Sequence, residues 1–273
     1  MQFINIVKAS ITQMIAEDGL MVAGYMSFAA LLSLFPFLLF LAAFLSFLGT
    51  QDQIDQIVSL LFDNLPEQMA EGLAPVIQEV LAGRKGGFLT FGAVVALWAA
   101  SNGVEALRVA LNRAYGVTKQ RPFWLKRLQS LLFVAIAAMT ALVISILILA
   151  GPILWRVADN YLGLDVVYAY AWGGFRYFIS ISMMIVVLIA LHLALPNRAA
   201  KLKAVMPGVL ASVLLFIIAA TAFSLYLQHF ASYSVTYGSL AGVVIALMFF
   251  YLTSIIFIFG GYLNRNVGQP GQP

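Results

Sequence analysis

Long apolar runs separated by short polar segments dominate the pattern of the chain. Residues 129–155 contain no charged side chain, and about 20 apolar residues are enough for one helix to cross the hydrocarbon core of a membrane. Runs of this kind predict an all-α fold, a polytopic membrane protein built as a six-transmembrane-helix bundle. The predicted spans are residues 21–48, 88–111, 130–154, 176–196, 204–228 and 238–262.

Two further segments have the apolar spacing of amphipathic helices. Apolar residues at 3, 4, 7, 11, 14 and 15 predict a helix over residues 2–18 that lies on the membrane surface before the first span. The same period recurs in the insertion 51–87, where it predicts two short helices broken near Pro66. Residues 1–264 are thus expected to form one transmembrane domain. The Gly-, Pro- and Gln-rich tail, 265–273, is expected to be disordered.

Composition agrees with a membrane location and argues against several functions. Hydrophobic residues make up 63% of the chain and charged residues 10%, whereas soluble domains are about 45–50% apolar and about 25% charged. The absence of cysteine excludes disulfides and thiolate chemistry, and no basic run with interleaved aromatics suggests nucleic acid. The sequence also lacks a zinc-protease motif, a nucleophile elbow and a phosphate-binding glycine loop. We therefore expect a non-enzyme with no catalytic residue, metal, cofactor or nucleic-acid partner.

The placement of basic residues predicts the orientation in the membrane. Lys and Arg concentrate in the short loops on the cytoplasmic side. Eleven of them fall at the two termini and in the loops after spans 2 and 4, against four in the other loops. This asymmetry predicts that both termini lie in the cytoplasm and that the insertion 51–87 lies outside.

A polar stripe interrupts the second span, in the stretch SNGVEALRVALNRAYG. Its members share a narrow arc of an ideal helix and are Ser101, Asn102, Glu105, Arg108 and Asn112. A charged group at membrane depth costs at least ~2.5–3.5 kcal/mol unless it is paired or hydrated. Two interpretations stay open: the stripe lines a cavity, or it is a helix end near the headgroups, with Glu105 as the i, i+3 partner of Arg108.

The first span offers a matching face. Tyr25, Ser33 and Pro36 lie within about 80° of one another on an ideal helix, and a kinked helix with polar groups beside the kink can build a site near the membrane midplane. Pro36 is either a hinge or a fixed bend that fits the helix to its neighbours. The residues predicted to line the cavity are Tyr25, Ser33, Asn102, Glu105, Arg108 and Asn112.

Two other features are interpreted as structural. Gly238 and Gly242 form a small-xxx-small pair that predicts close packing of span 6 against another helix. His192 and His229, the two histidines of the chain, are interpreted as partners of neighbouring groups rather than as proton relays.

Four stretches together make the chain similar to the YihY/BrkB family of bacterial inner-membrane proteins over nearly its whole length. They are AALLSLFPFLL (29–39), SNGVEALRVALNRAYG (101–116), LPNRAAKLKAVMPGVLAS (195–212) and YGSLAGVVIALMFFYLTSIIFIFGGYLN (237–264). The resemblance implies six helices, cytoplasmic termini and a bacterial inner (plasma) membrane. Members have carried the labels serum-resistance (virulence) factor and ribonuclease BN, and the family supplies no agreed binding residues.

The leading hypothesis is a transporter or lipid-translocating protein with a polar cavity between spans 1 and 2, where Arg108 attracts an anionic solute or lipid. The alternative is a non-transporting membrane scaffold or envelope-associated partner protein that uses the loop 51–87. A membrane-bound enzyme would need a metal site that the sequence does not show. The expected partners are the lipid bilayer, an anionic solute or lipid, and a second copy of the chain or another envelope protein.

Overall fold

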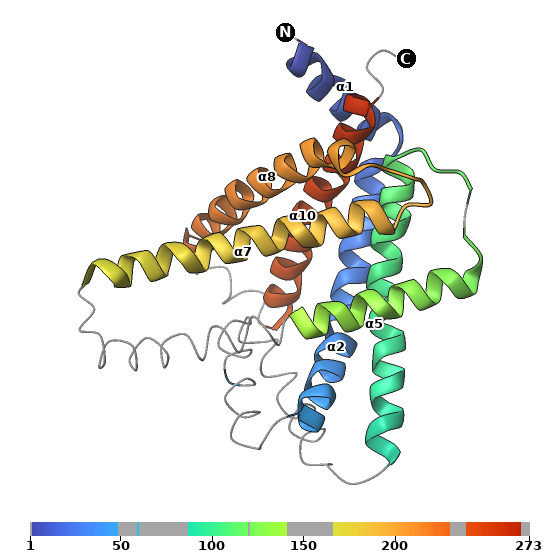
Figure 1. The fold of residues 1–273 in the computed structure, drawn as a ribbon, viewed down its shortest axis with the longest axis vertical. Coiled ribbons are helices and arrows are strands. Elements are labelled where there is room, and N and C mark those ends of the chain that lie inside the picture. The colour runs from blue at the N-terminus through green and yellow to red at the C-terminus, as the bar shows by residue number, and fades with distance from the viewer. Residues whose placement is uncertain are drawn as a thin grey trace. The chain divides into compact units, whose positions relative to one another are not determined.

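The computed structural model describes residues 2–48, 59, 87–119, 121–140, 166–229 and 239–268. All regular elements in these ranges are helices (Figure 1), which confirms the all-α prediction. They are α1 (Gln2–Ala16), α2 (Gly19–Leu48), α5 (Gly87–Ala114), the helix Phe123–Thr140, α7 (Val166–Ala194), α8 (Leu202–His229) and α10 (Ser239–Gly268).

Each predicted span overlaps a described helix, and residues 141–154 of the third predicted span lie outside the described residues. Among the described residues, five helices are long and apolar enough to cross a membrane, and the apolar segment Phe178–Ala194 of α7 is shorter. A polytopic membrane protein is therefore confirmed, and the count of six spans is approximate. The helix that contains the start of the third predicted span begins at Phe123, ahead of residue 130, because it includes the charged residues Lys126 and Arg127, which the apolar pattern left out. The insertion predicted at 51–87 lies almost wholly outside the described residues.

The chain forms two compact units. The first unit combines residues 1–35, 100–130 and 184–273, and the second combines residues 36–99 and 131–183. In the second unit, the described segments bury a small apolar core: Leu38, Leu41, Ala96, Val134 and Ala138. The polar stripe of α5 belongs to the first unit.

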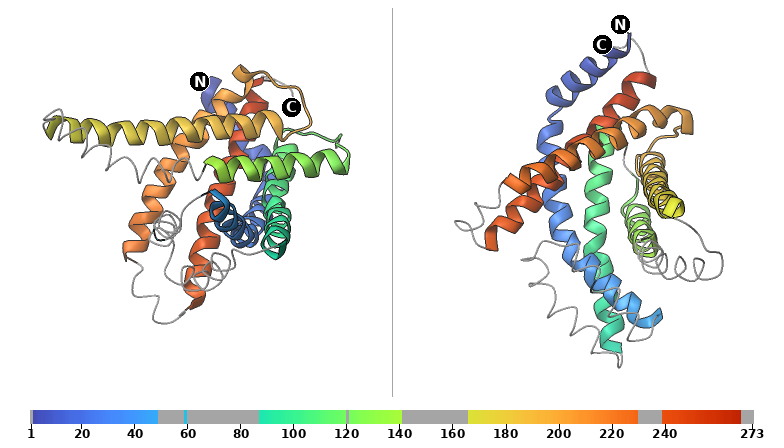
Figure 2. Two further views of the ribbon diagram at one scale, coloured as in Figure 1. Left: turned by 60° about the horizontal axis from the view of Figure 1, so that its bottom comes forward. Right: turned by 90° about the vertical axis from the view of Figure 1, so that its left-hand side faces the viewer.

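In the first unit, α8 and α10 lie side by side (Figures 1 and 2). Their backbones approach where Gly208 faces Gly260, and a methyl group added at Gly208 would collide with the carbonyl oxygen of Gly260. Nearby, Ser212 Oγ donates a hydrogen bond to the carbonyl oxygen of Ile256 at 3.2 Å. Small residues give membrane helices this close packing where lipid supplies no hydrophobic drive.

A tight turn at Glu17 and Asp18 joins α1 to α2. Asp18 has a φ of 56°, in the left-handed region that few non-glycine residues adopt. Arg265 Nη1 donates to both carboxylate oxygens of Glu17, at 3.0 and 3.1 Å, and Arg113 pairs with Asp18 at 3.1 Å. The turn is thus tied to the ends of α5 and α10.

The C-terminal end of α10 is held against α1. Asn266 Nδ2 donates to Ser10 Oγ at 3.1 Å and to Gln13 Oε1 at 3.0 Å. The helix runs to Gly268, past the predicted end of the domain at 264, because these contacts continue its packing. Residues 269–273 of the predicted tail lie outside the described residues.

Candidate functional site

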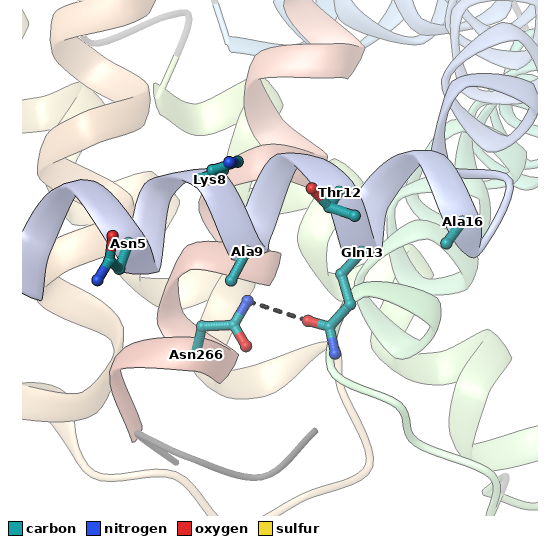
Figure 3. Close-up of a pocket in the computed structure, with 7 residues that line it drawn as sticks. All are labelled: Asn5, Lys8, Ala9, Thr12, Gln13, Ala16 and Asn266. Atoms are coloured by element: carbon teal, nitrogen blue, oxygen red, sulfur yellow. Dashed lines mark hydrogen bonds between the residues drawn. The ribbon is translucent and has the colours of Figure 1, made fainter.

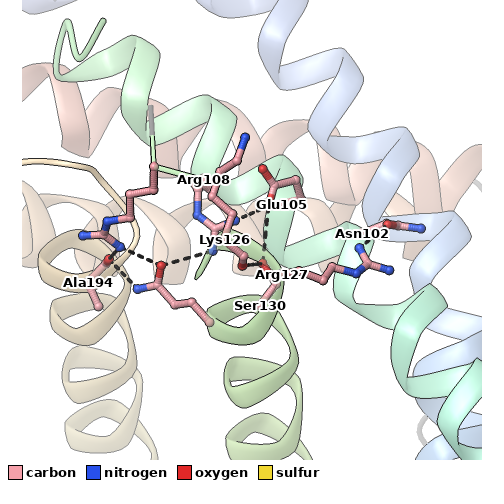
Figure 4. A network of polar contacts seen from close by, with 9 residues as sticks. Asn102, Glu105, Arg108, Lys126, Arg127, Ser130 and Ala194 are labelled. Carbon is pink, nitrogen blue, oxygen red and sulfur yellow. Dashed lines mark hydrogen bonds and ion pairs between the residues drawn. The ribbon is translucent and has the colours of Figure 1, made fainter. Parts of the chain in front are cut away.

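The centre of the candidate site is an ion pair on α5. Arg108 has 2% of its side-chain surface exposed and pairs with Glu105, of which 30% is exposed. Figure 4 shows both side chains reaching toward the helix Phe123–Thr140. The i, i+3 spacing predicted this pair, and the neighbouring helix completes its surroundings.

Three side chains of the loop and helix that follow α5 extend the pair into a network. Gln129 Oε1 accepts hydrogen bonds from Arg108 Nη2 at 3.3 Å and from Arg121 Nη1 at 2.7 Å. Ser130 Oγ lies 3.4 Å from Glu105 Oε2 and donates to the nearer carbonyl oxygen of Lys126 at 3.0 Å. The amide of Gln129 therefore bridges two guanidinium groups that would otherwise repel each other.

Arg121 and Gln129 also cap the C-terminal end of α7. Arg121 donates to the carbonyl oxygens of Ala194 at 2.9 Å and Pro196 at 3.3 Å, and Gln129 Nε2 donates to Ala194 at 2.6 Å. The last carbonyls of a helix lack partners within the helix and carry a partial negative charge. Arg121 thus acts as a cationic cap, which explains why an arginine is placed beside Arg108.

The two asparagines of the stripe are also bonded to neighbouring segments. Asn102 is exposed, and its Oδ1 accepts from Arg127 Nη1 at 3.0 Å. Asn112 Oδ1 accepts the backbone N–H of Asn197 at 3.2 Å. The stripe therefore contacts the polypeptide that follows α5 and α7.

We call the set Asn102, Glu105, Arg108, Arg121, Arg127, Gln129 and Ser130 the arginine network. It contains three guanidinium groups and a single carboxylate, Glu105, so it carries two positive charges in excess. Arg108 Nε is buried and has no hydrogen-bond partner in the described part of the chain. A buried donor of this kind costs about 1–3 kcal/mol, and an anion accepting that hydrogen bond would remove the cost.

Ser33 and Tyr25 of α2, the two polar residues predicted to line the cavity from the first span, lie outside the arginine network. Ser33 lies against Gly103 of α5, where an added methyl group would collide with its hydroxyl, and its Oγ donates to the carbonyl of Ala30 at 3.1 Å. Tyr25 has 51% of its surface exposed and is not a member of the arginine network. Spans 1 and 2 therefore meet at Ser33, and a cavity lined by Tyr25 and Ser33 together with the stripe stays a prediction.

The other predicted positions are partly described. Pro36 lies inside the continuous helix α2. Gly242 is buried in α10, and Gly238 lies outside the described residues. The hinge and packing roles of these residues stay predictions.

Sequence reasoning missed a second buried cluster in the first unit. Gly208 N–H donates to Asn264 Oδ1 at 2.6 Å, so the Asn264 amide must turn its Nδ2 toward Tyr115, to which it donates at 3.0 Å. The Tyr115 hydroxyl is also hydrogen-bonded to His192 Nδ1 at 2.6 Å, and the tautomer of the imidazole sets which of the two donates. Tyr115 and Asn264 each lie near the end of a quoted family stretch, but periodicity could not pair them.

Arg198 completes this cluster. Its guanidinium carbon lies 3.5 Å from the centroid of the Tyr115 ring, in cation–π contact. Burial raises the pKa of the Tyr115 phenol above its ordinary value, so the hydroxyl keeps its proton at neutral pH and can donate to His192. The cluster joins the ends of α5, α7, α8 and α10.

Replacing Tyr115 with phenylalanine is expected to lower the free energy of unfolding by about 1–3 kcal/mol, because Asn264 Nδ2 and His192 Nδ1 would then be buried without partners. The measurement is the thermal unfolding midpoint of the purified protein in detergent. Tyr25→Phe is the matched control, since the exposed Tyr25 hydroxyl should be replaceable without loss. Equal midpoints for the two variants would contradict the proposed chain of hydrogen bonds.

Among the described residues, no three His, Asp or Glu side chains come together in a way that could hold a metal ion. No solved structure matches the chain. A protein of Bacillus subtilis (strain 168), YfkH, described as ribonuclease-like, is 33% identical over 91% of this chain and 90% of its own length. A UPF0761 membrane protein of Pseudoalteromonas translucida is 28% identical over 89% of this chain and 79% of its own.

A UPF0761 membrane protein of Aliivibrio salmonicida is 26% identical over 95% of this chain and 82% of its own length. The family model described as virulence factor BrkB matches residues 10–272. That range includes the arginine network and the Tyr115 cluster. The chain therefore belongs to the BrkB family of membrane proteins.

Proposed function

We propose that the protein translocates a lipid or solute that carries an anionic group, and that the arginine network receives that group. The observation that supports this most directly is the excess of guanidinium over carboxylate beside a buried arginine whose Nε has no partner. Guanidinium groups bind phosphate and carboxylate through paired N–H donors.

The ion pair allows a bound anion to replace the Glu105 carboxylate at Arg108. An anion that approaches Arg108 competes with the Glu105 carboxylate, which is the more exposed partner. Displaced from Arg108, Glu105 still has the Ser130 hydroxyl 3.4 Å away, and that hydroxyl can turn from the Lys126 carbonyl to donate to it. The network can thus pass between a closed state, in which Glu105 neutralises Arg108, and an anion-bound state. Pro36 in α2 lacks an N–H donor and is proposed as the point where the helix bends between the two.

The direction of access follows from the basic residues. We propose that the end of the first unit that carries the arginine network faces the cytoplasm of a bacterial inner membrane, since Lys and Arg collect on that side. An anion would then reach Arg108 from the cytoplasmic leaflet or the cytoplasm.

The test uses purified protein reconstituted into vesicles that contain tail-labelled phosphatidylglycerol or phosphatidylcholine, with translocation followed by dithionite reduction. Wild-type protein is expected to move phosphatidylglycerol faster than protein-free vesicles do. Arg108→Gln is expected to lower this rate about tenfold or more, because a hydrogen bond to a charged group is worth about 1.5–3 kcal/mol. Lys119→Gln removes one exposed positive charge outside the network and is expected to leave the rate unchanged.

The solute form of the proposal has its own measurement. If a soluble anion occupies the network, inorganic phosphate is expected to raise the unfolding midpoint of the wild type, because a ligand that binds only the folded state stabilises it. Arg108→Gln should lose that increase. A wild type that neither moves phosphatidylglycerol nor gains stability from phosphate would contradict the proposal.

A second candidate is a non-transporting scaffold in which the stripe is an internal brace. It is favoured by the hydrogen bonds that join Asn102 to Arg127 and Asn112 to Asn197, since residues that line a water-filled cavity need no protein partners. In that case Arg108 would matter for stability alone, and the loop 51–87 would carry the contact with a partner.

A further inference from the structure

A narrow apolar strip is exposed along α1. Ile4, Ile11 and Ile15 have 70%, 42% and 58% of their surfaces exposed, and they fall within an arc of about 40° on an ideal helix. The other side of α1 packs against α10, with Ser10 and Met14 buried. The strip is thus the face that α1 turns away from its own unit.

Polar groups border the strip on one side. A shallow groove runs along α1 and is lined by Asn5, Lys8, Ala9, Thr12, Gln13, Ala16 and Asn266 (Figure 3). Lys8 projects from the middle of the exposed face, within about 60° of each isoleucine of the strip. α1 has no acidic residue, so its face combines three large aliphatic side chains with one uncompensated positive charge.

We infer that α1 lies in the headgroup layer of the bilayer, with the isoleucine strip directed at the acyl chains and Lys8 in contact with lipid phosphates. Continuity of the chain supports this occupant. The membrane-spanning segment of α2 begins at Gly19, directly after the turn at Glu17 and Asp18, so α1 cannot lie far from the membrane surface.

The physical chemistry of interfacial helices matches this face. Such helices bury an apolar stripe about 5–10 Å into the boundary between headgroups and acyl chains and keep lysine in the polar layer. The long aliphatic stem of Lys8 can rest on the strip while its ammonium group stays hydrated. In this position α1 holds Asn266, and the turn after α1 holds Arg265, at the end of α10.

The test uses the absence of native cysteine. Single cysteines at positions 4, 11, 15 and 12 are labelled with an environment-sensitive maleimide dye in the full-length protein. The protein is reconstituted into phosphatidylcholine vesicles with and without phosphatidylglycerol. Doxyl-labelled lipids report contact with the acyl boundary, and iodide reports contact with water. Thr12 lies in the groove and serves as the matched control.

Dyes at 4, 11 and 15 are expected to be quenched by the doxyl lipids and protected from iodide, and the dye at 12 to show the opposite order. In vesicles with phosphatidylglycerol, Lys8→Glu should reduce lipid quenching at position 11, because it places a negative charge against anionic headgroups. Iodide quenching at all four positions would overturn the inference. Protection of 4, 11 and 15 from both quenchers would also overturn it, since it would indicate a protein occupant such as a second copy of the chain.

Discussion

Gly208→Ala is expected to lower the stability of the protein more than any other single-methyl change described for it. The added methyl group would collide with the carbonyl oxygen of Gly260 and lie 2.6 Å from the side-chain amide carbon of Asn264. Overpacking of a close contact costs about 1–3 kcal/mol when side chains can move. Here one obstacle is backbone, so α8 and α10 must separate and the result should lie at the upper end of that range.

The loss should also reach the Tyr115 cluster. Gly208 N–H is the donor that sets the orientation of the Asn264 amide, and Asn264 in turn donates to Tyr115. Moving α8 would therefore leave Asn264 Oδ1 without its buried donor, and the orientation of the amide that donates to Tyr115 would no longer be set.

Gly24→Ala is the matched control, because an added methyl group at Gly24 in α2 meets nothing within 4 Å. Alanine is favoured over glycine in a helix by about 1 kcal/mol, so this variant should be unchanged or slightly more stable. The measurement is the thermal unfolding midpoint of each variant in detergent, which is monitored by size-exclusion chromatography of samples heated to increasing temperatures. A Gly208→Ala protein that unfolds with the wild type would show that α8 and α10 do not pack as described.

Removing the carboxylate of the ion pair is expected to be more harmful than removing the whole pair. Glu105→Gln leaves the Arg108 guanidinium buried without a counter-charge. Breaking a fully buried pair costs about 3–5 kcal/mol. Because Glu105 is 30% exposed, solvent screens part of the interaction, and we expect a smaller loss of about 1–3 kcal/mol.

The double variant Glu105→Gln, Arg108→Met should recover most of that loss, since apolar residues of similar volume often replace a buried ion pair without cost. The unfolding midpoints of the wild type, the two single variants and the double variant form the thermodynamic cycle. Equal losses in Glu105→Gln and the double variant would show that Arg108 is not destabilised by losing its counter-charge.

The double variant also separates the two candidate functions. If the arginine network receives an anion, the double variant should be folded and stable yet fail to move phosphatidylglycerol and fail to respond to phosphate. If the stripe is only a brace, Arg108 matters for stability alone, and a double variant with restored stability should behave as the wild type does in both measurements. A stable double variant that moves phosphatidylglycerol at the wild-type rate would show that the arginine network does not receive the anion, and a wild type that moves none would favour the scaffold.

The sequence by itself determined the class of the protein, an all-α polytopic membrane protein. An apolar run of membrane-spanning length is stable in lipid as an α-helix, because the helix satisfies each backbone N–H and C=O within its own segment. Local spacing also sufficed for the pair of Glu105 and Arg108, since residues three apart on a helix are neighbours.

Contacts between distant segments were decided by the tertiary structure. His192 and Asn264 both bond to Tyr115, although they are 77 and 149 residues away from it along the chain. Hydrophobic periodicity carries no record of which helix ends meet. Likewise, Gln129 and Arg121 both precede the predicted span 130–154, and packing alone brought them to Arg108 and to the end of α7. The sequence could predict where charge would be costly, and the fold decided which groups compensate for that cost.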